Sequence, residues 1–576
     1  MICIRLNDES FSYDIHSLVK AFYPAEDVKV ISGADDIHSD STLPEFSVYA
    51  GPEKTEVTDL TTGRCLHTLA TTAALREDRA AYKSELKRIM YRILAEYTGR
   101  ELPWGTLTGI RPTKLAMSYI EEAEAGAAEA GIGASAETGA DPCIEPDTGA
   151  GTSTIPKPEI VDGIVRMYRE KYLASEEKSR LAVDIAMRER RVLQDIVRKA
   201  GIEADAPNIA ANIIESDSPN TAARRITGTG LSAALAEGYS LYIGIPFCPS
   251  TCLYCSFMSY PIAAHKKAVA PYIEALKREI DYVASDFAGR RLDSIYIGGG
   301  TPTTLTSEQL KELISYVGDA LDLSHIREFT VEAGRADSID REKLKTLRNM
   351  GVDRISVNPQ TLNEDTLKLI GRKATAAETI EAYKLARDVG FDNINMDIIL
   401  GLPGETIDDI RYTLDGIAEL KPDDLTVHAL SVKRGSKLAE LLLTTDSIGR
   451  EPGTAGNDTD VSLRNNRIDY DEAMRLTSHT AASIGLRPYY LYRQKNISGN
   501  LENTGYAREG REGIYNILMM EEVQDIVAVG AGTVSKRVRL QPDGNVRIDR
   551  CDTHKDLKLY LENTDEMTER KRRLFG

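Results

Sequence analysis

Short apolar runs alternate with longer amphipathic stretches between about residues 241 and 430. Six such runs follow one another: LYIGI, SIYIGGG, EFTVEAG, RISVNPQ, NINMDIILG and DLTVHAL. Strands that are covered on both faces read as continuous apolar runs, and their alternation with helical stretches is typical of parallel βα units. The pattern therefore predicts an α/β fold with a full or partial (β/α) barrel over residues 239–430.

Unusual residues stand directly after these predicted strands. They are the cysteines after LYIGI, Gly298, Gly299 and Gly300 after SIYI, Glu332 in FTVE, Gln360 after RISVNP, and the GLPGE turn after NINMDIIL. In a barrel of parallel strands, the loops at the carboxyl ends converge on one face, where sites form. We therefore expect these residues, which are far apart in sequence, to meet in space.

The flanking segments predict further units. Residues 1–120 mix short apolar runs with a helical pattern, so we expect a small α+β domain there. Residues 121–157 are rich in Ala, Gly, Glu and Thr and offer little apolar surface to bury, which predicts a disordered insertion. Residues 158–238 are interpreted as a helical connector followed by a linker. Residues 431–576 are interpreted as a C-terminal accessory α/β domain that covers the barrel mouth.

Length and charge narrow the class of protein. At roughly 100 to 200 residues per domain, 576 residues suffice for several units. The 71 basic and 89 acidic residues give a net charge of −18, which disfavours nucleic acids and anionic membranes as partners. No window approaches the roughly 18 consecutive apolar residues of a membrane span, and the first residues lack the pattern of a signal peptide. We expect a soluble, cytoplasmic protein.

Three of the seven cysteines form a compact motif. Cys248, Cys252 and Cys255 follow a C-x3-C-x2-C spacing, while the other four are scattered singly. Three thiolates on one loop can hold a 4Fe-4S cluster and leave its fourth iron open to a substrate or cofactor. The alternatives are a structural zinc site that lacks its fourth ligand and three buried thiols that pack as small hydrophobic groups. The only nearby histidine, His265, lies ten residues beyond Cys255.

Several ordered motifs together carry a family resemblance. The stretch YIGIPFCPSTCLYC, YIGGGTPT, VEAG, NPQT, GRK and NMDIILGLPGE resembles the radical S-adenosylmethionine (SAM) enzymes, and in particular the oxygen-independent coproporphyrinogen III oxidase family. The resemblance covers most of the predicted barrel, with weaker similarity in GYAREG and VAVGAGTVS. It implies a radical SAM (β/α) barrel between the N-terminal and C-terminal domains, and two cofactors, a 4Fe-4S cluster and SAM.

The resemblance also implies roles for individual residues. The three cysteines would hold the cluster, Tyr242 would lie against the SAM on the open iron, and the segment from Gly298 to Thr301 would face SAM. Glu332 matches a further contact to this SAM. Contacts to a second SAM molecule would fall on Tyr254, Gly300, Thr301, Gln360, Arg372 and Asp397. Taken one by one, these residues have structural alternatives: a glycine turn, ion pairs at the barrel rim and a solvated arginine.

The implied reaction is the SAM-dependent oxidative decarboxylation of coproporphyrinogen III to protoporphyrinogen IX in haem biosynthesis, with an unidentified electron donor. Two departures bear on it. Decarboxylating members carry a further cysteine where this chain has Phe257, and usually a histidine where it has Gly244. A related branch that binds and delivers haem also lacks that cysteine. A haem-binding, chaperone-like protein, another radical reaction on a tetrapyrrole and an electron carrier therefore stay open as alternatives.

A substrate with four propionates needs local cations, and a tetrapyrrole can lie against aromatic rings. The candidates after the barrel are residues of two kinds. The cations are Lys433, Arg434, Arg493, Lys495 and Arg508, and the aromatic residues are Tyr489, Tyr490 and Tyr492. Solvated surface charge and core packing are the structural alternatives for these two groups.

Overall fold

The computed structural model divides the chain into two compact units. One unit comprises Met1–Arg188 and Leu491–Glu502, and the other comprises Glu189–Tyr490 and Asn503–Gly576. The structure describes residues 1–23, 26–32, 45–72, 75, 77–109, 111–129, 158–201, 230–433, 435–441, 468–493, 502–541 and 546–576.

The first unit is built on a five-stranded sheet with the order β2-β1-β3-β4-β5. Its strands are β1 (Ile2–Leu6), β2 (Val28–Ser32), β3 (Phe46–Ala50), β4 (Lys54–Asp59) and β5 (Arg64–Ala70). Strand β1 pairs in parallel with β2 and β3, whereas β3, β4 and β5 pair antiparallel. Helices α1 (Ser12–Phe22) and α3 (Arg79–Thr98) contribute Leu18, Leu86 and Met90 to a core that also contains Leu6. This mixed arrangement is the α+β type that the sequence predicts.

Three further helices belong wholly or partly to this unit: α4 (Thr113–Glu129), α5 (Pro158–Tyr172) and α6 (Glu176–Lys199). The predicted disordered insertion at 121–157 is wrong over its first part, because α4 continues to Glu129. Ala and Glu are good helix formers, so they extend a helix that Ala116 and Ile120 already anchor in the interior. The rest of that segment lies outside the described residues.

The second unit contains the six strands predicted for the barrel. They are β6 (Gly238–Ile245), β9 (Arg291–Gly299), β10 (Glu328–Gly334), β11 (Arg354–Val357), β12 (Ile394–Leu400) and β13 (Asp424–Ala429). Each strand pairs in parallel with the next in chain order. All their carboxyl ends therefore lie at one edge of the sheet, and the predicted βα barrel strands are confirmed.

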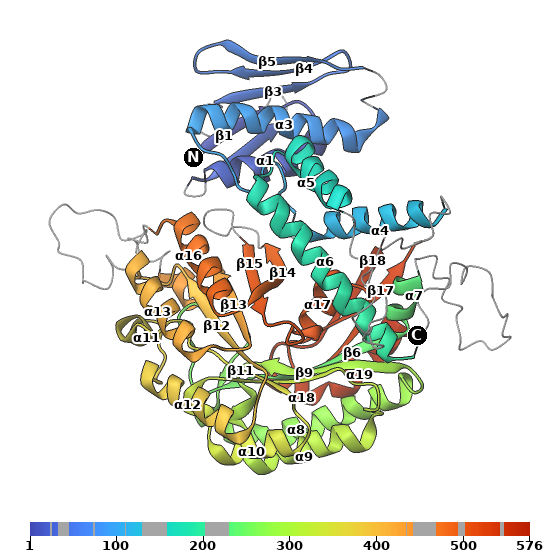
Figure 1. Cartoon of the computed structure of the whole chain (residues 1–576), viewed down its shortest axis with the longest axis vertical. Coiled ribbons are helices and arrows are strands. Elements are labelled where there is room, and N and C mark those ends of the chain that lie inside the picture. Colours follow the sequence, from blue (N-terminus) through green and yellow to red (C-terminus); the bar gives the residue numbers. More distant parts are fainter. Residues whose placement is uncertain are drawn as a thin grey trace, which may run out of the picture. The chain divides into compact units, whose positions relative to one another are not determined.

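Helices follow these strands and cover the outer face of the curved sheet (Figure 1). They are α8 (Ile262–Asp286), α9 (Ser307–Ala320), α10 (Arg341–Asn349), α11 (Glu364–Leu369), α12 (Ala376–Val389) and α13 (Ile407–Leu420). Helices α9, α12 and α13 each begin with a capping box, in which Thr306, Thr375 and Thr406 accept from the third helical backbone N–H. These caps satisfy donors that a helix start otherwise leaves free, so local sequence fixes where the helices begin.

The segment after residue 430 extends the same sheet at both ends. The full order is β14-β15-β13-β12-β11-β10-β9-β6-β16-β17-β18. The added strands are β14 (Arg487–Arg493), β15 (Glu502–Ala507), β16 (Asp525–Val529), β17 (Val534–Leu540) and β18 (Val546–Asp552). Strand β16 pairs in parallel with β6, and β15 pairs antiparallel with β13. The predicted boundary at residue 430 therefore does not separate two sheets.

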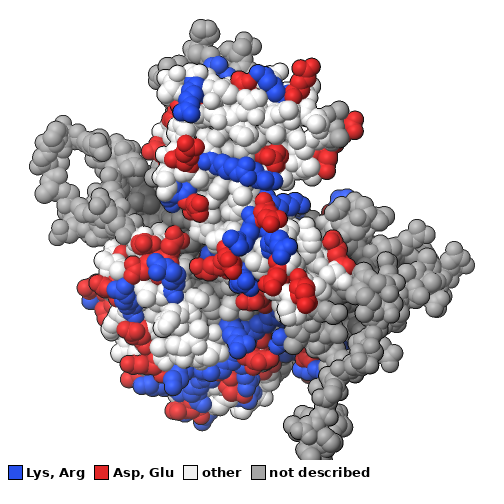
Figure 2. Space-filling model, turned by 45° about the horizontal axis from the view of Figure 1, so that its top comes forward, with Lys and Arg blue, Asp and Glu red and all other residues white. Residues whose placement is uncertain are grey.

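Five other α-helices of the second unit are α7 (Gly230–Ala236), α16 (Tyr470–Ser483), α17 (Ile514–Glu521), α18 (Leu557–Glu562) and α19 (Thr564–Phe575). No described helix is both long enough and apolar enough to cross a bilayer. On the face drawn in Figure 2, basic and acidic side chains are interspersed.

A buried ion pair ties the last helix to the barrel. Lys571 of α19 donates to Glu279 of α8, and both side chains are fully buried. The second oxygen of Glu279 accepts from the Tyr560 hydroxyl at 2.6 Å and from the Gly530 N–H at 2.7 Å. Because all these donors converge on one carboxylate, the charge is compensated inside the protein.

Removing the cation of this pair should destabilise the second unit strongly. We expect Lys571→Ala to lower the free energy of unfolding by about 3 to 5 kcal/mol, because the Glu279 carboxylate stays buried without its cation. Lys558→Ala is the control, since Lys558 is 82% exposed and lies 3.8 Å from Glu562, and it should cost less than about 1 kcal/mol. Urea unfolding of the two variants measures the difference, and equal losses would contradict the assignment.

Candidate functional site

The three cysteines lie on the loop that follows β6. Cys248 and Cys252 are buried, and Cys255 is partly exposed. The loop returns to the barrel, because the short strands β7 (Phe247–Cys248) and β8 (Tyr260–Pro261) pair with each other. Burial raises the pKa of the Cys248 thiol to about 11 and also raises the pKa of Cys255. Burial thus disfavours free thiolates there, and binding of a metal would have to displace the protons.

The glycine segment at the end of β9 contacts this loop through its backbone. The N–H of Gly300 donates to Ile245 O, and the N–H of Thr301 donates to Phe247 O, both at 2.7 Å. A Cβ on Gly300 would lie 2.6 Å from Phe247 O and 3.0 Å from the Cys248 Sγ. Gly299 has a φ of +112°, which side chains with a Cβ rarely adopt. Glycine is therefore required here by close backbone contact with the cysteine loop.

Glu332 lies on β10 beside the glycine segment. Its oxygens accept from the Tyr296 hydroxyl at 2.6 Å and from the Gly299 N–H at 3.2 Å. A register shift between Glu332 and Gly334 interrupts the pairing of β10 with β11, a feature that can redirect side chains at sites. Burial raises the pKa of Glu332 to about 7, against the lowering effect of the Tyr296 hydrogen bond. The carboxyl group is therefore poised between its two charge states near neutral pH.

Three aromatic rings stack on one another next to Glu332. Tyr296 lies 5.9 Å from Tyr242 and 4.7 Å from Tyr515, measured between ring centroids. Tyr242 is the residue that the resemblance places against SAM, and it comes from β6. Tyr515 comes from α17, and sequence reasoning missed it because nothing local distinguishes a tyrosine so far from the barrel motifs. Tyr296 was also missed, although its period-two spacing from Gly298 puts both on one strand face.

Gln360, Arg372 and Tyr254 form the other side of the site. Arg372 donates to Asn358 O at 2.5 Å and to the Tyr254 hydroxyl at 3.5 Å. Gln360 has a φ of +67°, and its N–H donates to Asp397 O at 2.9 Å. The side-chain oxygens of Gln360 and Asn358 are buried and have no hydrogen-bond partner. A strained backbone and unsatisfied buried acceptors are features that a bound ligand can compensate.

Asp397 and His428 face the same interior on neighbouring strands. Asp397 accepts from Asn395 Nδ2 at 2.7 Å. Burial lowers the pKa of His428, while the charge of Asp397 raises it. His428 was not among the predicted site residues, although the alternation of Asp424, Thr426 and His428 along β13 could have indicated it.

A buried arginine, Arg335, was also missed. It follows the VEAG motif, and its Nη1 donates to Ser250 O at 3.0 Å and to the Cys252 Sγ at 3.8 Å. Asp337 binds the same guanidinium through two hydrogen bonds of 2.9 and 2.7 Å. Arg335 thus brings a fixed positive charge to the cysteine loop, where a cluster bound by thiolates would be negatively charged.

Several candidates for the substrate carboxylates lie elsewhere. Arg493 belongs to the first unit, where it is buried, lies over the Trp104 ring and donates to Leu107 O. Arg508 pairs with Asp423, which precedes β13 and therefore lies at the amino ends of the strands, opposite the site. Arg508 therefore lies at the wrong end of the strands for a substrate carboxylate at the site. Arg493 makes its contacts within the first unit, and its role as a carboxylate ligand stays a prediction. Lys433 is exposed, and Arg434 and Lys495 lie outside the described residues.

The tyrosine run after α16 packs in the interior. Tyr489 and Tyr490 are buried with their ring centroids 4.8 Å apart, and the Tyr489 hydroxyl donates to Asp424 at 2.7 Å. The idea that these two rings face a tetrapyrrole is therefore wrong, and core packing explains them. Tyr492 is partly exposed.

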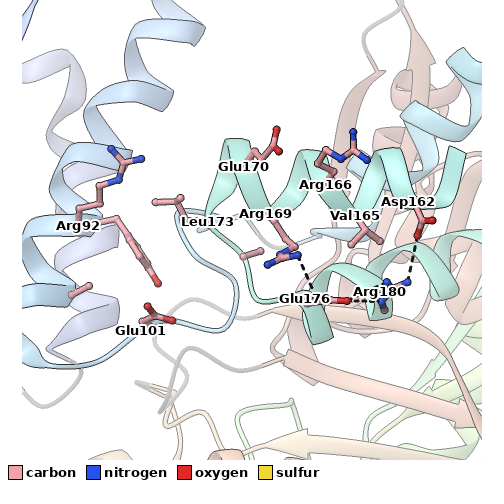
Figure 3. Close-up of a pocket in the computed structure, with 13 residues that line it drawn as sticks. Arg92, Glu101, Asp162, Val165, Arg166, Arg169, Glu170, Leu173, Glu176 and Arg180 are labelled. Carbon is pink, nitrogen blue, oxygen red and sulfur yellow. Dashed lines mark hydrogen bonds and ion pairs between the residues drawn. The ribbon is translucent and has the colours of Figure 1, made fainter. Parts of the chain in front are cut away.

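The first unit contains a separate pocket of about 800 Å³ between α3, α5 and α6. Figure 3 shows that four of its charged side chains, Asp162, Arg169, Glu176 and Arg180, pair with one another. Glu176 binds Arg180 at 3.1 Å and Arg169 at 3.3 Å, and Arg180 lies 3.7 Å from Asp162. None of the motif residues lines it, so it does not contribute to the site assigned above.

Within the part of the chain that the structure describes, no three His, Cys, Asp or Glu side chains are arranged to hold a metal ion. The assignment of the three cysteines as cluster ligands, and of the surrounding residues as SAM contacts, therefore stays a prediction. What the geometry adds is proximity: Thr301 Oγ1 lies 3.5 Å from the Cys248 Sγ, and Arg335 and the Arg372–Tyr254 pair adjoin the same loop.

Comparison with known proteins gives the family. The radical SAM superfamily matches residues 242–417. The oxygen-independent coproporphyrinogen-III oxidase-like protein HemZ of Bacillus subtilis is 35% identical over 500 residues, which cover 86% of this chain and 82% of that protein. The superfamily match implies a 4Fe-4S cluster and SAM.

Two other groups of relatives match about a third of this chain. The heme chaperone HemW of Bacillus subtilis is 37% identical over 34% of this chain and 51% of its own length. The oxygen-independent coproporphyrinogen III oxidase of Escherichia coli is 34% identical over 33% of this chain and 41% of its own length. The solved structure of coproporphyrinogen III oxidase (HemN) from Escherichia coli aligns with a TM-score of 0.42 at 21% identity, covering 60% of this chain and 74% of that one. On the similarity to HemZ over most of both chains, this chain belongs to the oxygen-independent coproporphyrinogen III oxidase-like family of radical SAM proteins.

Proposed function

We propose that this chain is a radical SAM oxidoreductase that converts coproporphyrinogen III to protoporphyrinogen IX by oxidative decarboxylation. The observation that supports this most is the convergence of Glu332, Gln360 and Arg372 beside the cysteine loop, at the carboxyl ends of parallel strands. Sites of (β/α) barrels form at this edge, and these polar groups suit the amino, carboxylate and ribose groups of SAM.

The residues present fit the two cofactors. Three thiols on one loop are the donor set of a cluster with an open iron, and the buried acceptors Gln360 Oε1 and Asn358 Oδ1 lack protein partners. Cys248, Cys252 and Cys255 would hold the cluster, and Tyr242, Tyr254, Gly299, Gly300, Thr301, Glu332, Gln360, Arg372 and Asp397 would contact SAM. Together the cofactors would supply the one-electron chemistry that abstracts a hydrogen atom from a propionate side chain.

The protein's own residues would orient and shield the reactants. The Arg372 guanidinium donates to Asn358 O and to the Tyr254 hydroxyl, which fixes its orientation. Its remaining N–H donors would then bind the carboxylate of SAM. The rings of Tyr242, Tyr296 and Tyr515 stack on one another beside Glu332 and would shield its carboxyl group from water. Loss of CO2 from each of two propionates would leave two vinyl groups; each loss would pass one hydrogen atom to a radical derived from SAM and one electron to a one-electron acceptor.

Haem binding is the second candidate function, and two positions favour it. Phe257 stands where decarboxylating members have a further cysteine, and its side chain is 76% exposed. A Cβ on Gly244 would lie 2.5 Å from the Thr533 methyl group. A histidine at position 244 would therefore require Thr533 to move. The 37% identity with a heme chaperone over about a third of this chain supports the same alternative.

One anaerobic assay separates these functions. The reconstituted protein is incubated with dithionite, SAM and coproporphyrinogen III, and the products are identified by mass spectrometry. We expect 5′-deoxyadenosine and a tetrapyrrole that has lost two carboxyl groups. Stoichiometric binding of haem without a vinyl product would favour the chaperone function, and 5′-deoxyadenosine with a different tetrapyrrole would indicate another radical reaction. Absence of 5′-deoxyadenosine in every condition would exclude all radical reactions.

Substitution of one cysteine tests the ligand set. Cys252→Ala should abolish the absorbance near about 400 nm of the reconstituted cluster, because two thiolates do not retain a cube. Cys65→Ala is the matched control, since Cys65 is an exposed thiol on β5 of the first unit, and its cluster should be intact. Cluster loss in the control, or retention in Cys252→Ala, would mean that other cysteines bind the iron.

The raised pKa of Glu332 predicts how SAM affinity depends on pH. A carboxyl group with a pKa of about 7 is mostly protonated at pH 6 and mostly ionised at pH 8. If the carboxylate binds SAM, affinity should rise by up to roughly tenfold over this interval. Calorimetry on the cluster-loaded protein measures this rise, which Glu332→Gln should abolish.

Asp353→Asn provides the control for this pH effect. Burial raises the pKa of Asp353 to about 7 as well, but this side chain accepts from the Phe329 N–H before the start of β11, away from the site. The rise in SAM affinity should persist in this variant. A pH profile that is the same in Glu332→Gln as in the unsubstituted protein would refute the role of Glu332.

A further inference from the structure

We propose that Glu328 and Tyr515 are positioning residues for the SAM site: Glu328 holds the start of α17, and α17 holds the Tyr515 ring against Tyr296, the partner of Glu332. The inference rests on the proposed function, because it takes Glu332 as a contact to SAM. It adds two residues that the family motifs do not contain, and it assigns them a role in binding SAM.

Glu328 caps α17 from a distant strand. Glu328 is the first residue of β10, and its side chain is buried. One carboxylate oxygen accepts from the Ile514 N–H at 2.6 Å, and the other accepts from the Tyr515 N–H at 3.3 Å. A helix start leaves such N–H groups without a partner inside the helix, and Gly513 at the cap position has no side chain to offer them. The Glu328 carboxylate therefore takes the place of a local cap.

A buried cluster holds the same turn of α17 from another direction. A Cβ on Gly513 would lie 2.8 Å from the Tyr489 hydroxyl oxygen and 3.3 Å from Arg354 Nη2. Tyr489 and Arg354 donate to the same oxygen of Asp424, at 2.7 and 2.6 Å, and all three side chains are buried. The backbone of α17 thus begins in close contact with side chains of β11, β13 and β14.

Tyr515 carries this fixed position to the site. It is the second residue of α17, and its ring centroid lies 4.7 Å from that of Tyr296 and 6.1 Å from that of Tyr242. The Tyr296 hydroxyl in turn donates to Glu332 at 2.6 Å. Figure 1 shows α17 on the inner side of the curved sheet, opposite the helices that cover its outer face. A single ring therefore separates α17 from the side chain that binds Glu332.

The register of β10 explains how one helix can reach both ends of the strand. Glu328, Thr330 and Glu332 alternate along β10 and so share one of its faces. Thr330 is paired with Tyr296 of β9, so Tyr296 lies at a level between the two glutamates. Glu328 at the amino end and Glu332 at the site are therefore connected through α17 and Tyr296 as well as through the strand itself.

Core packing is the structural alternative for Tyr515, and pH dependence distinguishes the two roles. The groups around the Glu332 carboxyl are the Tyr296 hydroxyl and the Gly299 N–H of β9, Asp397 of β12, Tyr242 of β6 and Tyr515 of α17. Water that replaced the Tyr515 ring would favour the charged form of Glu332 and lower its pKa. A ring that only filled space would change stability and leave SAM affinity as it is.

Substitution of Tyr515 tests the inference, with SAM binding to the cluster-loaded protein measured by calorimetry from pH 6 to pH 8. We expect Tyr515→Ala to weaken binding at pH 8 by about fivefold, because Tyr296 loses the ring that it stacks on. The midpoint of the rise in affinity with pH should fall by about 0.5 pH units, since Glu332 becomes more hydrated. Tyr515→Phe keeps the ring and should preserve both values.

A buried tyrosine outside the site provides the matched control. Tyr383 of α12 is buried as well, but its hydroxyl donates to Leu420 O at 3.0 Å, next to the amino end of β13. Tyr383→Ala should lower stability without changing SAM affinity or its pH midpoint. If Tyr515→Ala does not fold, Tyr515→Leu fills more of the space and removes the same aromatic contact.

The role of Glu328 has a readout that does not need the cofactors. Hydrogen exchange of the α17 backbone, followed by mass spectrometry on the cluster-free protein, should become about tenfold faster in Glu328→Ala, because Ile514 and Tyr515 lose their acceptors. The same variant should weaken SAM binding in the loaded protein. Glu328→Gln keeps one acceptor oxygen and should recover part of both losses.

Three results would overturn the inference. They are an unchanged SAM affinity and pH midpoint in Tyr515→Ala, an equal change in Tyr383→Ala, and a loss in Tyr515→Phe as large as in Tyr515→Ala, which would assign the effect to the hydroxyl group. Glu332→Gln separates this failure from failure of the SAM site itself. If that variant loses the rise in affinity with pH while the Tyr515 variants keep it, only the positioning role is wrong. Binding is measured without tetrapyrrole, so the outcome does not depend on the proposed reaction.

Discussion

The cysteine loop passes over the end of β9 at backbone contact distance, and the site depends on this approach. A Cβ at position 300 would lie 2.6 Å from Phe247 O, so the two segments can meet only because Gly300 has none. Hydrogen bonds from the Gly300 and Thr301 N–H groups then lock the loop to the strand. Because β9 also positions Tyr296 and the Glu332 carboxyl group through Gly299, the proposed cluster ligands and SAM contacts share one rigid frame.

The interior of the site is costly for the protein to maintain. Glu332 is buried with a raised pKa, Gln360 holds a strained backbone conformation, and the side-chain oxygens of Gln360 and Asn358 lack partners. Burying a polar group without a hydrogen bond costs about 1 to 3 kcal/mol. The parallel sheet and its covering helices supply the stability that tolerates this cost. Such an interior is arranged for a polar ligand rather than for its own packing.

The C-terminal segment extends the barrel sheet at both ends. Glu279 holds the Gly530 turn through one oxygen and Lys571 through the other. Tyr272 donates to Gly244 O at 2.6 Å and accepts from the Ala531 N–H, so the turn lies against β6 just before the cysteine loop. The Thr533 methyl group then fills the space that a side chain at position 244 would need. This packing gives a physical reason for one departure from the decarboxylating relatives.

The sequence by itself determined the six parallel strands and the cysteine spacing, because continuous apolar runs and short motifs are local signals. It also indicated that Glu332 and Gln360 meet near the cysteines, since they stand at the ends of parallel strands, whereas Arg372 was implied there only by the family resemblance. Only the tertiary structure decided that Tyr515 and Arg335 join them, that Tyr489 packs in the interior and Arg493 contacts Trp104 in the first unit, and that β15 and β16 extend the barrel sheet. These outcomes depend on which segments, far apart in the sequence, pack against one another. Such contacts produce no periodic pattern of apolar residues that could be read from the sequence.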